Sequence, residues 1–146
     1  MDFKMWLEDC ESRGYNCTMR KAAINQVYSL TTGKESAKWT YIKNPASEYR
    51  EYYVFDGKRL YKIIFDNKDG RQIESWNING VNKITYRICS SKGEEVRSID
   101  LHIGEDPISF SSAEDVPSKD IIAFERWAPI YNELIEAFYK MLIEQI

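Results

Sequence analysis

Three side chains in the second half of the chain have the types that acid–base chemistry requires: His102, Asp100 and Arg87. A histidine titrates near neutral pH, a carboxylate can orient it, and a guanidinium can neutralise negative charge that develops during a reaction. The same three types also pair across neighbouring strands on any solvated sheet face. The sequence therefore offers them as catalytic candidates but leans towards a protein that is not an enzyme.

Signatures of metal and cofactor sites are missing from the sequence. The single histidine excludes a two-histidine metal site, and Cys10, Cys17 and Cys89 lack the spacing of metal ligands. Gly33-Lys34 lacks the upstream glycine and the following serine or threonine of a phosphate-binding loop. We therefore predict no metal and no cofactor. An odd number of cysteines and an acidic N-terminal segment are typical of a reducing compartment, so we expect a cytoplasmic protein.

A series of turn signals divides residues 49–103 into short apolar runs. The signals are Asp56-Gly57, Asp69-Gly70, Asn79-Gly80 and Lys92-Gly93. In the first three, glycine follows Asp or Asn, a pair that easily takes the positive φ angles of a tight hairpin. The pattern predicts an antiparallel meander with strands at 51–55, 59–65, 71–78, 81–90 and 95–103. Further short strands are indicated near 39–42 and near 108–110.

The strands of this meander are of two kinds. At 98–103, apolar and polar residues alternate, which is the pattern of a strand with one buried and one wet face. The wet face carries the acid–base candidates. The first hairpin is instead apolar on both faces. It must be covered on both sides, or else it leaves an aromatic patch on which Tyr53, Phe55 and Tyr61 would bind a partner.

Amphipathic helices are predicted on either side of the meander. Residues 2–12 and 18–30 repeat apolar side chains at helical spacing, and a longer seam begins at Phe124, with Pro129 as an expected kink or break. We predict a single α+β domain over residues 1–146. Its parts are two N-terminal helices, a five- or six-stranded antiparallel meander, and a long kinked C-terminal helix on the apolar sheet face.

Charge is distributed unevenly along the chain. Residues 18–43 hold five basic residues and one acid, whereas residues 94–120 hold eight acids and two basic residues. The net charge of −3 argues against nonspecific binding to duplex nucleic acid, which needs a basic surface. The acids of the 104–118 loop instead suit a partner with a basic surface. The candidates in that loop are Glu105, Asp106, Glu114 and Asp115.

Three functions remain compatible with these patterns. The first is a non-enzymatic protein-binding module of the small inhibitor, immunity or regulatory-adaptor kind, as a monomer or weak homodimer. The second is a small-ligand-binding domain with a pocket between the sheet and the C-terminal helix, lined by Trp76, Tyr86 and Phe124. The third is an enzyme that uses the polar face around His102. No apolar run approaches the roughly 20 residues that cross a membrane, so no membrane partner is expected.

Overall fold

The computed structural model describes every residue of the chain except 67, 69, 119 and 146. The elements are α1 (Phe3–Ser12), α2 (Thr18–Leu30), β1 (Trp39–Lys43), β2 (Glu51–Phe55), β3 (Arg59–Phe65), β4 (Arg71–Asn77), the 3₁₀ turn η1 (Ile78–Gly80), β5 (Val81–Ser91), β6 (Glu94–Ile103), β7 (Asp106–Ser111) and α3 (Ile121–Gln145). The predicted α+β class, N-terminal helical pair and long C-terminal helix are confirmed.

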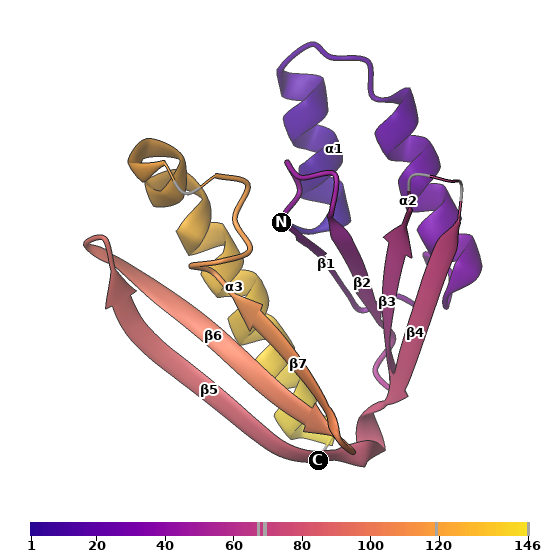
Figure 1. Cartoon of the computed structure of the whole chain (residues 1–146), viewed down its shortest axis with the longest axis vertical. Coiled ribbons are helices and arrows are strands. Elements are labelled where there is room, and N and C mark those ends of the chain that lie inside the picture. The colour runs from indigo at the N-terminus through magenta and orange to yellow at the C-terminus, as the bar shows by residue number, and fades with distance from the viewer. Residues whose placement is uncertain (67, 69, 119, 146) are drawn as a thin grey trace.

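The strands form two antiparallel sheets rather than one meander. Sheet A has the order β1-β2-β3-β4 and sheet B the order β5-β6-β7. The two sheets diverge from η1, with α3 running along sheet B and the helical pair lying beside sheet A (Figure 1). The prediction of a single five- or six-stranded sheet is therefore wrong.

The error arises at Asn79-Gly80, which does not form a hairpin. Gly57 and Gly93 take φ angles of 94° and 80° and turn the hairpins in which they lie. Gly80 has no such positive φ, and its segment winds into η1, where the Asn77 side chain accepts the Asn79 N–H at 3.0 Å. An Asn-Gly pair is compatible with a hairpin turn and with a 3₁₀ turn, so only tertiary packing decides which of the two forms. The signal at Asp69-Gly70 includes Asp69, which lies outside the described residues.

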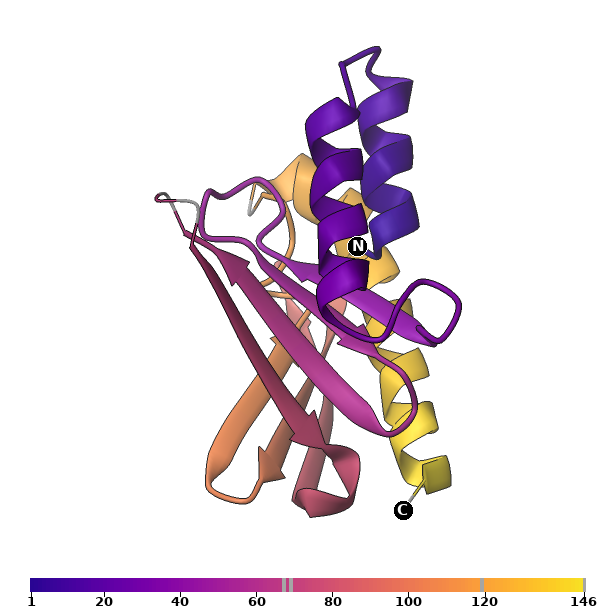
Figure 2. The ribbon, with the colours of Figure 1, turned by 90° about the vertical axis from the view of Figure 1, so that its right-hand side faces the viewer.

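Strands β1 and β2 of sheet A are covered on both faces. The helical pair packs on one face, where the Tyr52 ring lies 6.1 Å from that of Phe3 and 5.7 Å from that of Trp6. On the opposite face Phe55 meets Phe138 of α3 edge-on at 5.3 Å. Figure 2 shows α1 and α2 standing side by side and projecting past the strands. The two-sided apolar pattern of the first hairpin therefore reflects burial on two sides.

Helix α3 also packs along sheet B. Tyr86 of β5 lies against Tyr139 of α3 with ring centroids 4.4 Å apart, and Ile99 and Leu101 of β6 are fully buried. Pro129 lies inside α3, and the helix continues beyond it to Gln145. The alternative of a break at Pro129 is therefore wrong, and one continuous helix contacts both sheets.

Trp39 joins sheet A to α3. Its ring stacks on Phe138 with centroids 4.2 Å apart and on Tyr41 with centroids 5.2 Å apart. Phe110 from β7 meets the same indole edge-on at 5.3 Å. The indole N–H donates to the Leu134 carbonyl of α3 at 2.9 Å. One buried side chain therefore contacts sheet A, sheet B and α3 together.

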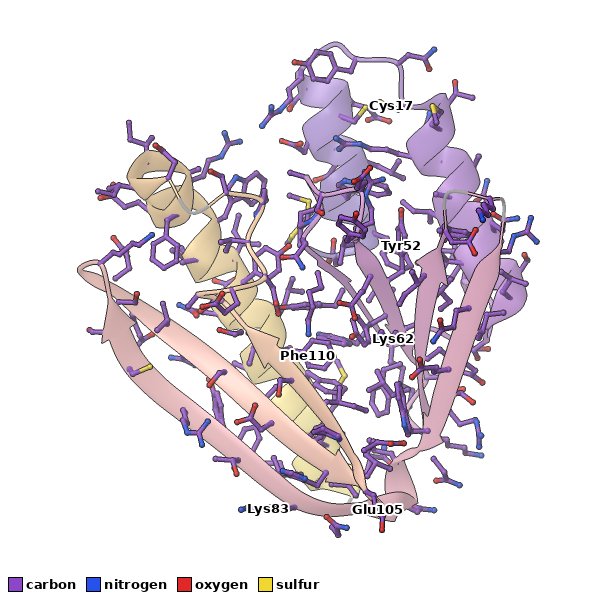
Figure 3. The ribbon with its side chains drawn as sticks, viewed as in Figure 1. Cys17, Tyr52, Lys62, Lys83, Glu105 and Phe110 are labelled. Atoms are coloured by element: carbon purple, nitrogen blue, oxygen red, sulfur yellow. The ribbon has the colours of Figure 1, made fainter. Side chains whose placement is uncertain are left out.

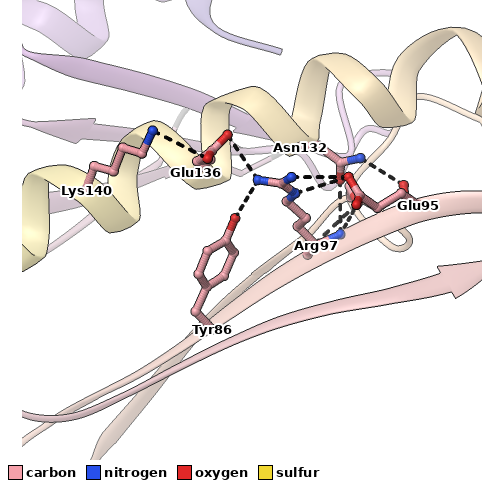
Figure 4. Close-up of polar contacts among 7 residues, drawn as sticks. Tyr86, Glu95, Arg97, Asn132, Glu136 and Lys140 are labelled. Carbon is pink, nitrogen blue, oxygen red and sulfur yellow. Dashed lines mark hydrogen bonds and ion pairs between the residues drawn. The ribbon is translucent and has the colours of Figure 1, made fainter.

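A polar network fixes α3 against β6 (Figure 4). The Asn132 amide donates to the Glu95 carbonyl at 2.8 Å and accepts the Arg97 N–H at 3.0 Å. The Arg97 guanidinium donates to the Tyr86 hydroxyl at 2.9 Å and pairs with Glu136 at 3.0 Å. Asn132 is buried, and leaving such groups without partners costs about 1–3 kcal/mol each. These bonds therefore specify one position of the helix along the strand.

Trp39→Ala should destabilise the protein by about 3–5 kcal/mol, because it leaves a cavity among buried aromatic rings and removes the hydrogen bond to Leu134. Trp39→Phe should cost less, since it keeps most of the ring contacts and loses the N–H bond to Leu134. Urea unfolding followed by circular dichroism measures both losses. Trp76→Ala, at a half-buried indole on β4, is the matched control. A Trp39→Ala loss no larger than that of the control would contradict the role of Trp39.

Candidate functional site

The acid–base candidates lie on the outer face of sheet B. The register places Lys83 opposite His102 and Thr85 opposite Asp100. Figure 3 shows Lys83 on the outer side of β5. The Asp100 carboxylate accepts from Arg87 at 2.6 Å through one oxygen and from the Ser109 hydroxyl at 2.6 Å through the other. A carboxylate can orient an imidazole for acid–base catalysis, and here Arg87 and Ser109 engage both oxygens of Asp100. The arrangement is that of a cross-strand ion pair.

The aromatic residues of the first hairpin are mostly inside the molecule. Tyr53 is 2% exposed and Phe55 is fully buried, whereas Tyr61 is half-buried. The Tyr53 ring meets Phe110 of β7 at 4.7 Å, and its hydroxyl donates to Glu51 at 2.8 Å. Burial raises the pKa of Tyr53, and the Glu51 carboxylate raises it further. Tyr53 is therefore a packing residue between the sheets, and Phe55 packs between sheet A and α3.

The three residues expected to line one ligand pocket lie in separate environments. The Trp76 indole N–H on β4 donates to Asp106 at 3.0 Å. Tyr86 packs against α3 within the network around Arg97. Phe124, near the start of α3, lies under the Lys92 ammonium at 5.4 Å. The structure therefore does not gather these three aromatic rings around one pocket.

The acids of the 104–118 loop are divided by β7. Glu105 and Asp106 lie at the turn that enters this strand, and Glu114 and Asp115 lie beyond its end. A six-residue strand spans roughly 20 Å, so the two pairs lie well apart. Figure 3 shows Glu105 at the bottom of the view. Glu105, Asp106 and Glu114 are exposed, whereas Asp115 is only 4% exposed.

Asp115 links the loop to both sheets. One carboxylate oxygen accepts the Tyr41 hydroxyl at 2.7 Å and the Ser111 N–H at 2.8 Å, and the Asp115 carbonyl accepts the Asn44 N–H at 3.1 Å. Burial raises the pKa of Asp115, although Lys43 and these hydrogen bonds oppose the shift. An open polar pocket of about 440 Å³ adjoins the carboxyl. Because its hydrogen bonds connect β1 with β7, we interpret Asp115 as a structural residue.

The most apolar open groove of the helical pair lies between α1 and α2, and we call it the lysine-rimmed groove. Its volume is about 460 Å³. The floor consists of the buried Phe3 and Ile24 and the half-buried Leu7 and Tyr28. The Phe3 and Tyr28 rings meet edge-on at 5.4 Å. The amphipathic stripes of the two helices are therefore wider than sheet A can cover, and part of them faces solvent.

Three exposed lysines surround this groove: Lys4, Lys21 and Lys34. Lys4 approaches Glu8 at 3.9 Å and Lys21 approaches Glu11 at 3.9 Å, between side chains that are all more than half exposed. Such pairs contribute little stability, so the lysines can exchange partners freely. None of the described residues that line the groove is acidic. Lys21 and Lys34 belong to the basic segment 18–43, whereas Lys4 lies outside it.

Metal sites, disulfides and membrane-spanning helices are not evident among the described residues. No three His, Cys, Asp or Glu side chains among them gather closely enough to hold a metal ion. The cysteines are free, with Cys10 and Cys17 buried and Cys89 exposed. None of the helices in the described part of the chain is long and apolar enough to span a membrane.

Comparison with protein families, with curated proteins and with solved structures finds no match to this chain.

Asp115→Asn should stabilise the protein increasingly as the pH rises. The raised pKa means that folded Asp115 keeps its proton where the unfolded chain, titrating near pH 4, has lost it. The folded state then binds more protons than the unfolded state, so Asp115 lowers stability as the pH rises through its folded pKa. Asparagine cannot ionise but still offers Tyr41 and Ser111 an acceptor.

Urea unfolding of both proteins between about pH 4 and pH 7 measures this difference, at about 1.4 kcal/mol for each unit of raised pKa. Glu105→Gln, at an exposed acid, controls for the loss of one negative charge. A stability difference between Asp115→Asn and wild type that stays constant over this range would contradict the prediction.

Proposed function

We propose that the protein is a non-enzymatic protein-binding module, and that its lysine-rimmed groove takes an acidic amphipathic helix of a partner. The observation that supports this proposal is an apolar floor enclosed by three exposed lysines and by no acid among the described lining residues. A partner helix would place apolar side chains on the floor and carboxylates against the rim. This is the helix-in-groove mode of recognition.

The dimensions of the groove suit a few anchoring side chains. A volume of about 460 Å³ accommodates two or three large apolar residues, such as those one helical turn apart. The anchors would contact Phe3 and Ile24, which the domain already holds in place from below. Since preorganised contacts lose little entropy on binding, a short helix could bind with useful affinity.

Charge supports an acidic rather than a basic partner. The acids that suggested a basic partner lie in two pairs at opposite ends of β7, and Asp115 is buried. The three lysines instead surround one concave surface. Their attraction for a partner would speed association and would weaken as salt screens it. The enzyme alternative relies on His102 and Asp100. Both oxygens of Asp100 already accept hydrogen bonds, one from Arg87 and one from Ser109.

Calorimetric titration with two synthetic helices tests the proposal. Both are stapled peptides of about 16 residues with apolar residues at i, i+3, i+4 and i+7, flanked by glutamate in one and by lysine in the other. Wild type should bind the glutamate peptide and not the lysine peptide. Lys21→Glu with Lys34→Glu should weaken binding by about tenfold or more, since two attractions become repulsions.

The matched control is Lys58→Glu with Lys83→Glu, which changes the same charge at exposed lysines outside the groove. This control should bind within about twofold of wild type, because distant exposed charges are screened. Equal binding of the two peptides, or equal loss in the two double variants, would refute the proposed groove.

A further inference from the structure

The indole N–H of Trp6 is a buried polar group without a partner. Trp6 is 1% exposed, and its Nε1 is the one side-chain nitrogen or oxygen that stays buried and unbonded among the described residues. Buried N–H groups in native proteins are nearly always hydrogen-bonded to protein, water or ligand. An exception of this kind marks a place where a further group is expected.

Two arginines converge on the same indole ring. The Arg20 guanidinium carbon from α2 lies 4.8 Å from the ring centroid, and that of Arg50, just before β2, lies 5.2 Å from it. Arg20 donates to the Trp6 carbonyl at 2.7 Å and approaches Asp9 at 3.6 Å, and Arg50 donates to the Ser47 carbonyl at 3.1 Å. Each guanidinium is thus oriented by a backbone carbonyl.

These residues line a pocket of about 350 Å³, which we call the arginine–tryptophan pocket. It lies between the helical pair and the first hairpin of sheet A, away from the lysine-rimmed groove, which has none of these residues in its lining. Tyr52, whose phenol interacts with Arg50, and Phe65 supply aromatic surface. The volume is that of a small-molecule site at the lower end of the usual range.

Two carboxylates also line this pocket and limit the ligand it can take. They belong to Glu48 and Asp66, and one Asp66 oxygen already accepts the Lys68 and Gly70 N–H groups at 2.9 and 2.7 Å. The pocket is lined by two guanidinium groups and two carboxylates, with Asp9 paired to Arg20 from outside the lining. It would attract a single anionic group to the arginines but repel an extended polyanion.

We propose that the arginine–tryptophan pocket binds a small aromatic ligand that carries one anionic group, a carboxylate or a phosphate. The anion would accept from Arg20, Arg50 and the Trp6 indole N–H, and the aromatic body would lie against Tyr52 and Phe65. This inference does not depend on the proposed protein-binding groove. It also differs from the pocket expected between the sheet and the C-terminal helix.

Nuclear magnetic resonance titration of the indole N–H signals tests the inference directly. The four tryptophans give four such signals, and Trp6→Phe assigns the one from Trp6. Phenylacetate and phenyl phosphate are the probes, with phenylacetamide as the neutral control and phenethylamine as the cationic one. The Trp6 signal should shift with an anionic probe and stay in place with both controls. Comparison of the two anionic probes distinguishes a carboxylate ligand from a phosphate ligand.

Arg20→Gln and Arg50→Gln should each weaken binding of the anionic probe by about tenfold, since each removes a charge-assisted donor. Arg126→Gln is the matched control, because Arg126 also lies over an indole, that of Trp127 on α3, at 5.0 Å. It should bind like wild type. The three other indole signals report whether each variant remains folded. An unmoved Trp6 signal at millimolar probe, equal binding of phenylacetamide, or full affinity in the Arg20→Gln and Arg50→Gln variants would overturn the inference.

Discussion

The packing of Trp39 against α3 is the interaction on which the rest of the structure depends. The two sheets share no strand ladder in the described residues, and side-chain packing joins them beyond the short η1 connection. Trp39 stacks on Phe138 and Tyr41, meets Phe110 and donates to Leu134. Burying a large aromatic ring stabilises by several kcal/mol, and the hydrogen bond orients the ring. Sheet A, sheet B and α3 are therefore held by one shared core.

That shared core decides which surfaces are left for binding. Because α3 and β7 cover one face of β2, the first hairpin has only its other face for the helical pair. Its aromatic residues are buried on both faces, as the packing of Tyr52 against Trp6 and of Phe55 against Phe138 demonstrates. Within the described part of the chain no element packs on the outer side of the helical pair, and part of its remaining apolar surface forms the lysine-rimmed groove. Binding is therefore best sought around α1 and α2.

The local elements were largely predictable from the sequence, and their assembly was not. Apolar and polar residues alternate at 98–103, and β2 is apolar on both faces. Both patterns can be read from the two-residue repeat of side chains along a strand, which is a local property. Asn79-Gly80 fits a hairpin or a 3₁₀ connection equally well, and the choice depends on how β5 packs on α3. Pro129 lies within a continuous helix because tertiary packing offsets its local cost.

The candidate sites were harder to foresee because each joins distant segments. His102 and Asp100 are neighbours by strand period, yet the partners of Asp100 come from β5 and β7. The Asp115 carboxylate accepts a hydrogen bond from Tyr41, which lies 74 positions earlier in the chain. The ring of Trp6 meets Arg20 and Arg50, and no pattern in the sequence connects these three residues.

Native-state hydrogen exchange measured over a series of denaturant concentrations tests the shared core most directly. If α3 and Trp39 hold the two sheets as one cooperative unit, the slowest amides of β2, β6 and α3 should exchange with one free energy of opening. If sheet A opened at a free energy lower by more than about 2 kcal/mol while β6 and α3 stayed protected, the sheets would be separate units. That result would contradict the account.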